Sequence, residues 1–175
     1  MRIPDSGPVR RFAPYLLLLL PLLFYLPSLL GFPYPAADAE FSDIAITHLP
    51  NYIFLKNSLL NGVVPLWSPL LFSGTPFAAN PLSGLWYPPG WLALLFSPLI
   101  GFSLVVMIHI VWGGLGMALL LRSQGLSLWA SLFGALAFEA LPKLIAHFGA
   151  GHLTILYALP WFPWLIWLSA RPRSS

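Results

Sequence analysis

The chain has 175 residues, of which 58% are hydrophobic and 7% are charged, with a formal net charge of +3. Soluble domains carry about 25% charged residues, so these figures exclude a water-soluble domain and predict an all-α polytopic membrane protein. The basic residues flank apolar runs and do not cluster with stacking aromatics, so a nucleic-acid partner is not predicted. Cysteine is absent, which excludes disulfides, cysteine-ligated zinc and a thiol nucleophile.

The first predicted elements are a basic N-terminus and an apolar span. Residues 1–13 contain Arg2, Arg10 and Arg11, and residues 14–32 form an apolar run about as long as a bilayer requires. A basic start before a leucine-rich run is also typical of a signal peptide. The length of the run, its prolines and the weak cleavage region at 33–38 favour a retained transmembrane helix.

Residues 33–88 are predicted to form a long, structured extracytoplasmic loop. Ser42 can cap a short amphipathic helix that begins at Asp43 and ends at Asn61-Gly62. Such a helix would lie on the membrane surface through its apolar positions, which are Ile44, Ile46, Leu49, Ile53, Leu59 and Leu60. Prolines and glycines punctuate the rest of this loop, and its aromatics are predicted to anchor it at the interface.

Three further spans are predicted after the loop. Residues 89–121 comprise a lead-in (91–99), read either as a separate helix or as the first turns of a bent span, and a crossing segment with glycines for close helix packing. Residues 127–141 form the third predicted span and residues 142–152 a second extracytoplasmic loop. Residues 153–170, bent by two prolines, form the fourth, and residues 171–175 a cytoplasmic tail.

The basic residues predict the orientation of these four spans. One side of the membrane receives Arg2, Arg10, Arg11, Arg122, Arg171 and Arg173, and the other receives Lys56 and Lys143. The positive-inside rule places the arginine-rich side, with both termini, in the cytoplasm. The two loops then share the extracytoplasmic side, which brings together seven polar residues: Asp38, Glu40, Asp43, His48, Lys143, His147 and His152.

The sequence of the first loop resembles that of a known family. An acid–x₄–His–x–Pro sequence precedes a helix ending in Asn-Gly, then P-L-W-S-P (65–69) and F-S-G-T-P-F-A-A-N-P-x-S-G-x-W-Y-P (72–88). This order resembles the first outer loop of bacterial membrane proteins of the YfhO type and of related GT-C-fold glycosyltransferase-like proteins. Ser68 stands where that family usually has Asn. The later A-H-F-G-A-G-H and L-P-W-F-P-W are similar to its second outer loop and fourth span. The resemblance covers roughly residues 12–171.

The resemblance implies transfer of a sugar from a polyprenyl-phosphate donor on the extracytoplasmic face. Such chemistry needs a carboxylate that deprotonates the acceptor hydroxyl or holds a metal ion against the donor phosphate. Asp43 matches the family's acid best and is the predicted catalytic residue, with Asp38 and Glu40 as alternatives. These three could also share a divalent metal ion, although their spacing is not diagnostic. A plain helix-start carboxylate is the structural alternative for Asp43.

Other polar residues are given supporting roles. His48, Lys143, His147 and His152 could contact the donor phosphate, or could simply be interfacial and helix-end polar groups. Trp67, Asn80 and Tyr87 could bind the acceptor or give the loop its structure.

Two ionisable residues fall inside predicted spans. Glu139 is a functional candidate by position, or forms an i,i+4 ion pair with Lys143. His109 is read as a buried hydrogen-bonding partner.

The sequence therefore predicts a glycosyltransferase-like protein of the bacterial cytoplasmic membrane, with membrane lipid and a polyprenyl-phosphate-linked sugar as its partners. Proteins of this type are usually longer, so the chain is predicted to be an N-terminal part whose C-terminal remainder is a further partner. The alternatives are a non-catalytic subunit or transporter fragment whose outer loop binds a lipid or partner, and a truncated pseudo-enzyme. Paired interrupted helices in two repeated halves, which transporters show, are not visible in the sequence.

Overall fold

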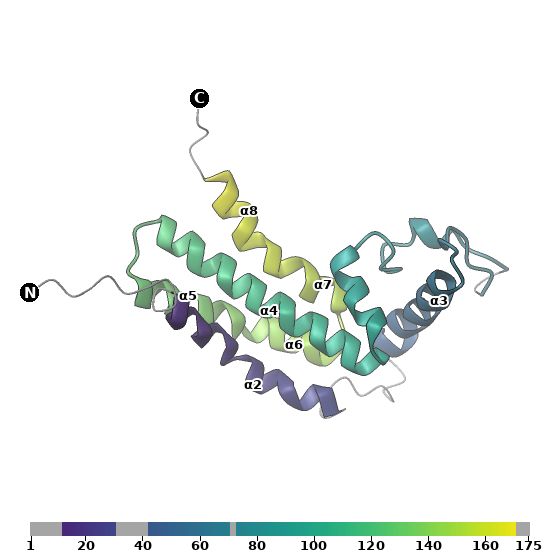
Figure 1. The fold of residues 1–175 in the computed structure, drawn as a ribbon, viewed down its shortest axis with the longest axis horizontal. Helices are drawn as coiled ribbons and strands as arrows, with labels where there is room; N and C mark the ends of the chain where they lie inside the picture. Colours follow the sequence, from purple (N-terminus) through teal and green to yellow (C-terminus); the bar gives the residue numbers. More distant parts are fainter. Residues whose placement is uncertain (1–11, 31–41, 71–72, 171–175) are drawn as a thin grey trace, which may run out of the picture.

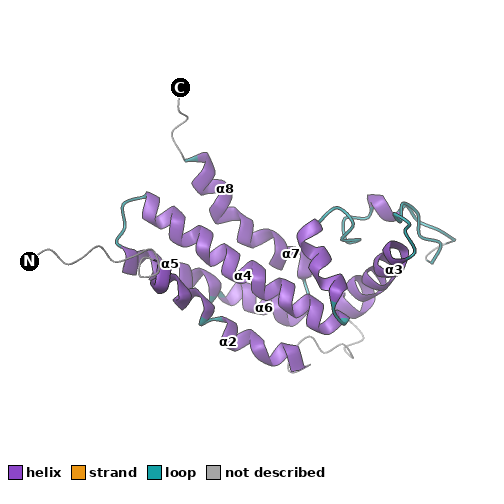
Figure 2. Ribbon diagram, in the orientation of Figure 1, coloured by secondary structure: helices purple, strands orange, loops and turns teal. Residues whose placement is uncertain are grey.

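The computed structural model describes residues 12–30, 42–70 and 73–170, in which the regular secondary structure is helical apart from one isolated β-bridge between Ser68 and Thr75. Figure 2 shows the helices and the loops that join them. The first half contains η1 (Ala13–Leu19), α2 (Leu22–Tyr25), η2 (Leu26–Leu30), the π-helical η3 (Ile44–His48), α3 (Leu49–Leu60), η4 (Phe77–Ala79) and η5 (Pro88–Leu95). The second half contains α4 (Pro98–Ser123), α5 (Leu128–Glu139), α6 (Pro142–Ala150), α7 (Leu153–Ala158), η6 (Leu159–Trp161) and α8 (Phe162–Ser169).

Three helical segments of the described chain are long and apolar enough to cross a membrane, namely Ala13–Leu30, Pro98–Ser123 and Leu128–Ala150. The first is largely 3₁₀-helical, and its rise of about 2.0 Å per residue lengthens an 18-residue segment. The fourth predicted span is a shorter apolar helix, Leu153–Ser169, interrupted by η6 at Pro160. Length alone therefore supports three of the four predicted crossings.

The lead-in to the second span is a separate element. The 3₁₀-helix η5 ends at Leu95, and α4 begins at Pro98, which occupies the first turn where a missing N–H costs nothing. Pro98 therefore starts the long helix and does not break it.

The segment 142–152, predicted as a loop, is mostly helical. α6 continues the path of α5 after a short break, with Pro142 in its first turn, and ends at Gly151. The φ of Gly151 is +80°, the left-handed conformation in which a helix commonly terminates. The segment is helical and not an irregular loop because Leu144 and Phe148 bury one face of α6, which its lysine, histidine and glycine residues do not indicate. Its extracytoplasmic placement stays a prediction.

The predicted loop helix is formed by η3 and α3 together, and α3 ends at Leu60, directly before the predicted stop at Asn61-Gly62. Ile44 of the predicted apolar face is buried together with Tyr52 and Leu55, whereas Ile46, Ile53 and Leu60 are exposed, as residues that face a membrane surface would be. The helix thus packs through Tyr52, whose hydroxyl donates to the Phe96 carbonyl at 2.6 Å.

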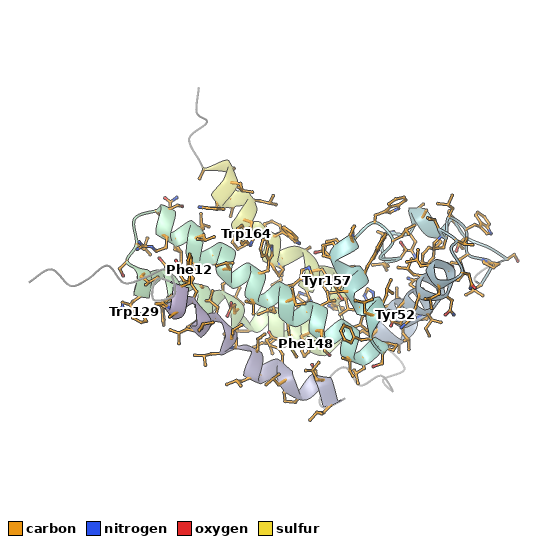
Figure 3. The ribbon with its side chains drawn as sticks, in the orientation of Figure 1. Phe12, Tyr52, Trp129, Phe148, Tyr157 and Trp164 are labelled. Carbon is orange, nitrogen blue, oxygen red and sulfur yellow. The ribbon has the colours of Figure 1, made fainter. Side chains whose placement is uncertain are left out.

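The long helix α4 lies at the centre of the structure, with α5 and α8 packed against it (Figure 1). The predicted close packing at its glycines is present: Gly113 faces Phe138 and Pro160, and Gly114 faces Glu139. Figure 3 places Tyr52 and Tyr157 toward the end of the bundle that carries α3, and Phe12 and Trp129 at the opposite end. The irregular segment between α3 and η5 lies beside α3, away from the turn joining α4 to α5 (Figure 1).

We predict that Gly114→Ala lowers the free energy of unfolding by about 1–3 kcal/mol, because the added methyl group would collide with the Glu139 carboxylate. Gly149→Ala is the matched control, since a Cβ there meets nothing within 4 Å. Reversible unfolding in mixed micelles, followed by circular dichroism, gives the comparison. Equal stability of the two variants would contradict the packing described for α4 and α5.

Candidate functional site

A chain of polar side chains joins the start of the π-helix to the turn after α6. His152 Nε2 lies 3.4 Å from Asp43 Oδ2, and His152 Nδ1 lies 2.8 Å from His147 Nδ1. Because a carboxylate only accepts, we assign the proton on His152 Nε2 to the Asp43 contact. In the neutral ring, Nδ1 then accepts from His147. The structure thus brings together three of the residues that the sequence placed on one side of the membrane.

Backbone geometry brings His48 into the same group. In a π-helix the main-chain bond joins residues five apart, so Asp43 and His48 lie on nearly the same side of η3. An α-helix would separate them. Pro50 contributes, since it has no N–H to bond residue 46. Burial is the main cause that lowers the pKa of His48; the charge of Asp43 opposes this shift and His152 adds to it.

The turn after α6 touches the start of η3 directly. A Cβ on Gly151 would lie 3.1 Å from both Ile44 Cγ1 and Ser42 Oγ, so only glycine allows this approach without displacement. Ser42 Oγ also accepts from the Ile44 amide at 3.3 Å, as a capping residue does. The close approach of Gly151 to Ser42 and Ile44 therefore holds the neighbouring residues Asp43 and His152 in contact.

A cavity of about 520 Å³ opens next to this polar group. Its volume falls in the range of small-molecule sites, roughly 300–1,000 Å³. One wall comes from α3 and the segment after it, and the other from α7, η6 and α8. Most of the lining is apolar or aromatic, with a few polar side chains, which are His48, Asn51, Ser83 and Thr154. A ligand with a polar head and an apolar chain fits this lining.

Tyr87 forms part of the wall and belongs to a directional hydrogen-bond chain. Trp161 Nε1 donates to Tyr87 Oη at 2.8 Å, and Tyr87 Oη also meets His109 Nε2. His109 Nδ1 lies 2.7 Å from the Val105 carbonyl and must donate to it, so in the neutral ring Nε2 accepts from Tyr87. His109 is buried and has the structural role predicted for it.

Tyr87 stacks on Tyr157 with the ring centroids 5.7 Å apart. Burial raises the pKa of Tyr87, and the hydrogen bond from Trp161 partly offsets this. The hydroxyl is therefore a neutral donor. The role of Tyr157 and Trp161 in the cavity was not predicted from the sequence. The only available signal was the short L-P-W-F-P-W motif, which does not indicate which partners its tryptophans meet.

Trp67 and Asn80 lie elsewhere. The Trp67 indole covers Gly74, and Asn80 Oδ1 accepts from the Leu82 amide at 2.9 Å in the manner of an Asx-turn. Neither belongs to the cavity lining. Both contacts are ones that give the loop its structure, and acceptor binding by these two residues stays a prediction.

Lys143 and Glu139 do not pair. Lys143 is exposed on α6, Glu139 is 0% exposed, and no ion pair joins them among the described residues. The ion-pair interpretation of Glu139 was therefore wrong, because the break at Ala140-Leu141 interrupts the helical spacing on which it depended. Lys143 also has no described contact with the polar chain of Asp43, His152 and His147.

Asp38 and Glu40 lie outside the described residues, so the metal site considered for Asp38, Glu40 and Asp43 has no described geometry. Within residues 12–30, 42–70 and 73–170, no group of three or more histidine, aspartate or glutamate side chains is arranged to hold a metal ion. Comparison with known proteins gives no further identification: no family model, curated protein or solved structure matches the chain.

We predict that Tyr87→Phe lowers the free energy of unfolding by about 1–3 kcal/mol, because it leaves His109 Nε2 and Trp161 Nε1 without partners in apolar surroundings. Tyr15→Phe is the control, since the described structure shows no hydrogen bond for the Tyr15 hydroxyl. Thermal unfolding in micelles measures both. A loss for Tyr87→Phe no larger than that for the control would show that the chain of bonds contributes nothing to stability.

The lowered pKa of His48 predicts an acid-sensitive fold. Between the ordinary value of 6.5 and the lower folded value, the unfolded chain binds a proton that the folded chain does not. The free energy of unfolding should therefore fall as pH falls through this window. His48→Gln should reduce that dependence, measured as unfolding free energy against pH. An unchanged slope in the variant would place the acid sensitivity elsewhere.

Proposed function

We propose that this chain is a GT-C-type glycosyltransferase-like protein that transfers a sugar from a polyprenyl-phosphate donor at the extracytoplasmic face of a bacterial cytoplasmic membrane. The observation that carries the proposal is the apolar cavity beside His48, with the Asp43–His152 pair next to it. In this proposal the bent helix Leu153–Ser169 is the fourth crossing, and both termini are cytoplasmic.

Asp43 is the proposed general base. Its side chain is 54% exposed, so an acceptor can reach it from solvent. The acceptor hydroxyl gives its proton to the carboxylate while its oxygen bonds to the anomeric carbon. The bond between that carbon and the phosphate oxygen breaks, and polyprenyl phosphate leaves with the electron pair. Positioned proton transfer of this kind contributes roughly 10²–10⁴-fold to rate.

His152 orients the proposed base. Its Nε2 contact holds one carboxylate oxygen, which leaves the other free for the acceptor. His147 and His152 bond to one another, so their proposed contribution at the donor phosphate is shared and not that of two independent cations. His48, which lines the cavity and is neutral at neutral pH, offers a hydrogen bond to the phosphate.

The cavity is the proposed site for the lipid chain of the donor. Its aromatic and aliphatic walls offer no charge to an isoprenoid chain, and its polar side chains include His48 near the proposed base. A lipid-binding subunit without catalysis would use the same walls. The two functions therefore differ only at Asp43.

We predict that Asp43→Asn lowers the rate of sugar transfer by about 10²–10⁴-fold, because the amide cannot take up the acceptor proton. The measurement is transfer from a panel of polyprenyl-phosphate sugars in membranes containing the longest available reading frame, at matched expression. Asp5→Asn is the control, since it makes the same change on the predicted cytoplasmic side. Unchanged transfer in the Asp43 variant would remove this residue from the mechanism.

Lipid binding and sugar transfer, measured on the same variants, separate the enzyme from a non-catalytic subunit. Ala158 lines the cavity, so Ala158→Trp should abolish cross-linking by a photoactivatable polyprenyl phosphate, whereas Asp43→Asn should retain it. Ala137→Trp, on the exposed surface of α5, is the matched control. Lipid binding without transfer by the unmutated chain would favour the subunit. If Ala158→Trp still cross-links at this site, the cavity is not the lipid site.

A further inference from the structure

Glu139 is a carboxylic acid enclosed within the helices. It is the last residue of α5, its side chain is 0% exposed, and neither carboxyl oxygen has a hydrogen-bond partner in the described structure. No ion pair of the described residues involves it. Buried carboxylates are almost always paired, since an isolated ion loses its hydration without replacement.

Gly114 makes the space that the carboxyl fills. A Cβ on Gly114 would overlap Glu139 Oε1, so the acid lies directly on the backbone of α4. Glu139 lines neither of the two described cavities. Among the described residues, no group of three or more histidine, aspartate or glutamate side chains could hold a metal ion there, whereas a proton needs no second ligand.

Tyr25, from the first membrane-length helix, is a titratable group that interacts electrostatically with Glu139. Its hydroxyl is within electrostatic range of the carboxyl and is likewise buried without a hydrogen-bond partner. Thus two unpartnered polar groups, from different helices, lie in the same apolar interior. Neither supplies the positive charge that an ionised glutamate would require.

We propose that Glu139 is a proton-binding site inside the membrane, holding its proton while α5 is packed against Gly114 and releasing it when that contact opens. The proposal is independent of sugar transfer and does not involve Asp43. An intramembrane acid of this kind marks a functional position by default. Its ligand is the proton itself, and the acid form stabilises the packing of α4 and α5.

The protonation state of Glu139 can be measured at its side-chain carboxyl carbon alone. It contains two glutamates, Glu40 and Glu139, so Glu40→Gln leaves Glu139 as the single one. That variant, labelled with ¹³C at the glutamate carboxyl and reconstituted in phosphatidylcholine vesicles, gives one carboxyl resonance. Its chemical shift distinguishes acid from carboxylate, and circular dichroism confirms that the fold is kept.

The resonance is expected at the acid position in neutral buffer, and to become that of a carboxylate when the chain is unfolded, where glutamate titrates near about 4.3. A carboxylate resonance in the folded protein at neutral pH would overturn the proposal. Adding Gly114→Ala should increase the carboxylate fraction at neutral pH, whereas adding Gly149→Ala should not. Identical fractions in these two variants would overturn release by opening of the contact.

Discussion

The contact between the start of η3 and the turn at Gly151 and His152 is the interaction on which the site depends. It joins segments more than a hundred residues apart, through Gly151 against Ser42 and Ile44 and through His152 against Asp43. Neither the packing of Gly151 nor the Asp43–His152 pair would fix the orientation of Asp43 alone. Exposed ion pairs contribute little to stability, and a backbone approach carries no polar specificity. Together they fix the orientation of Asp43 and set one side of the cavity next to His48.

Much of the fold could be predicted because local sequence patterns indicate it. Apolar length and proline placement indicate the membrane-length helices, and Asn61-Gly62 indicates where α3 ends. Segment 142–152 could not be read in this way. Its polar residues resemble a loop, and its helical character depends on burying Leu144 and Phe148 against other elements. In α3, the tertiary contact of Tyr52 with the Phe96 carbonyl likewise depends on a residue 44 positions away, which local spacing does not indicate.

The candidate site could be predicted only as a set of residues. Charge distribution placed Asp43 and three of the histidines on one side of the membrane, and the structure joins Asp43, His147 and His152. Pattern alone could not show that a π-turn would align His48 with Asp43. Nor could it show that Tyr87 would bond to residues 22 and 74 positions away. Such partners depend on how the helices pack, and no local spacing encodes them.

Asp43 and Glu139 show how surroundings assign different chemistry to the same functional group. Asp43 is half exposed and paired with a histidine, so its charge is solvated and available to a reactant. Glu139 is enclosed against a glycine and has no partner, so its charge would be unsolvated and its neutral form is favoured. One position suits proton abstraction from a substrate at the surface. The other suits proton storage in the interior, where release requires the helices to move. The chain thus places two carboxyl groups with opposite requirements about a hundred residues apart, and the packing of α4 and α5 keeps Glu139 away from solvent.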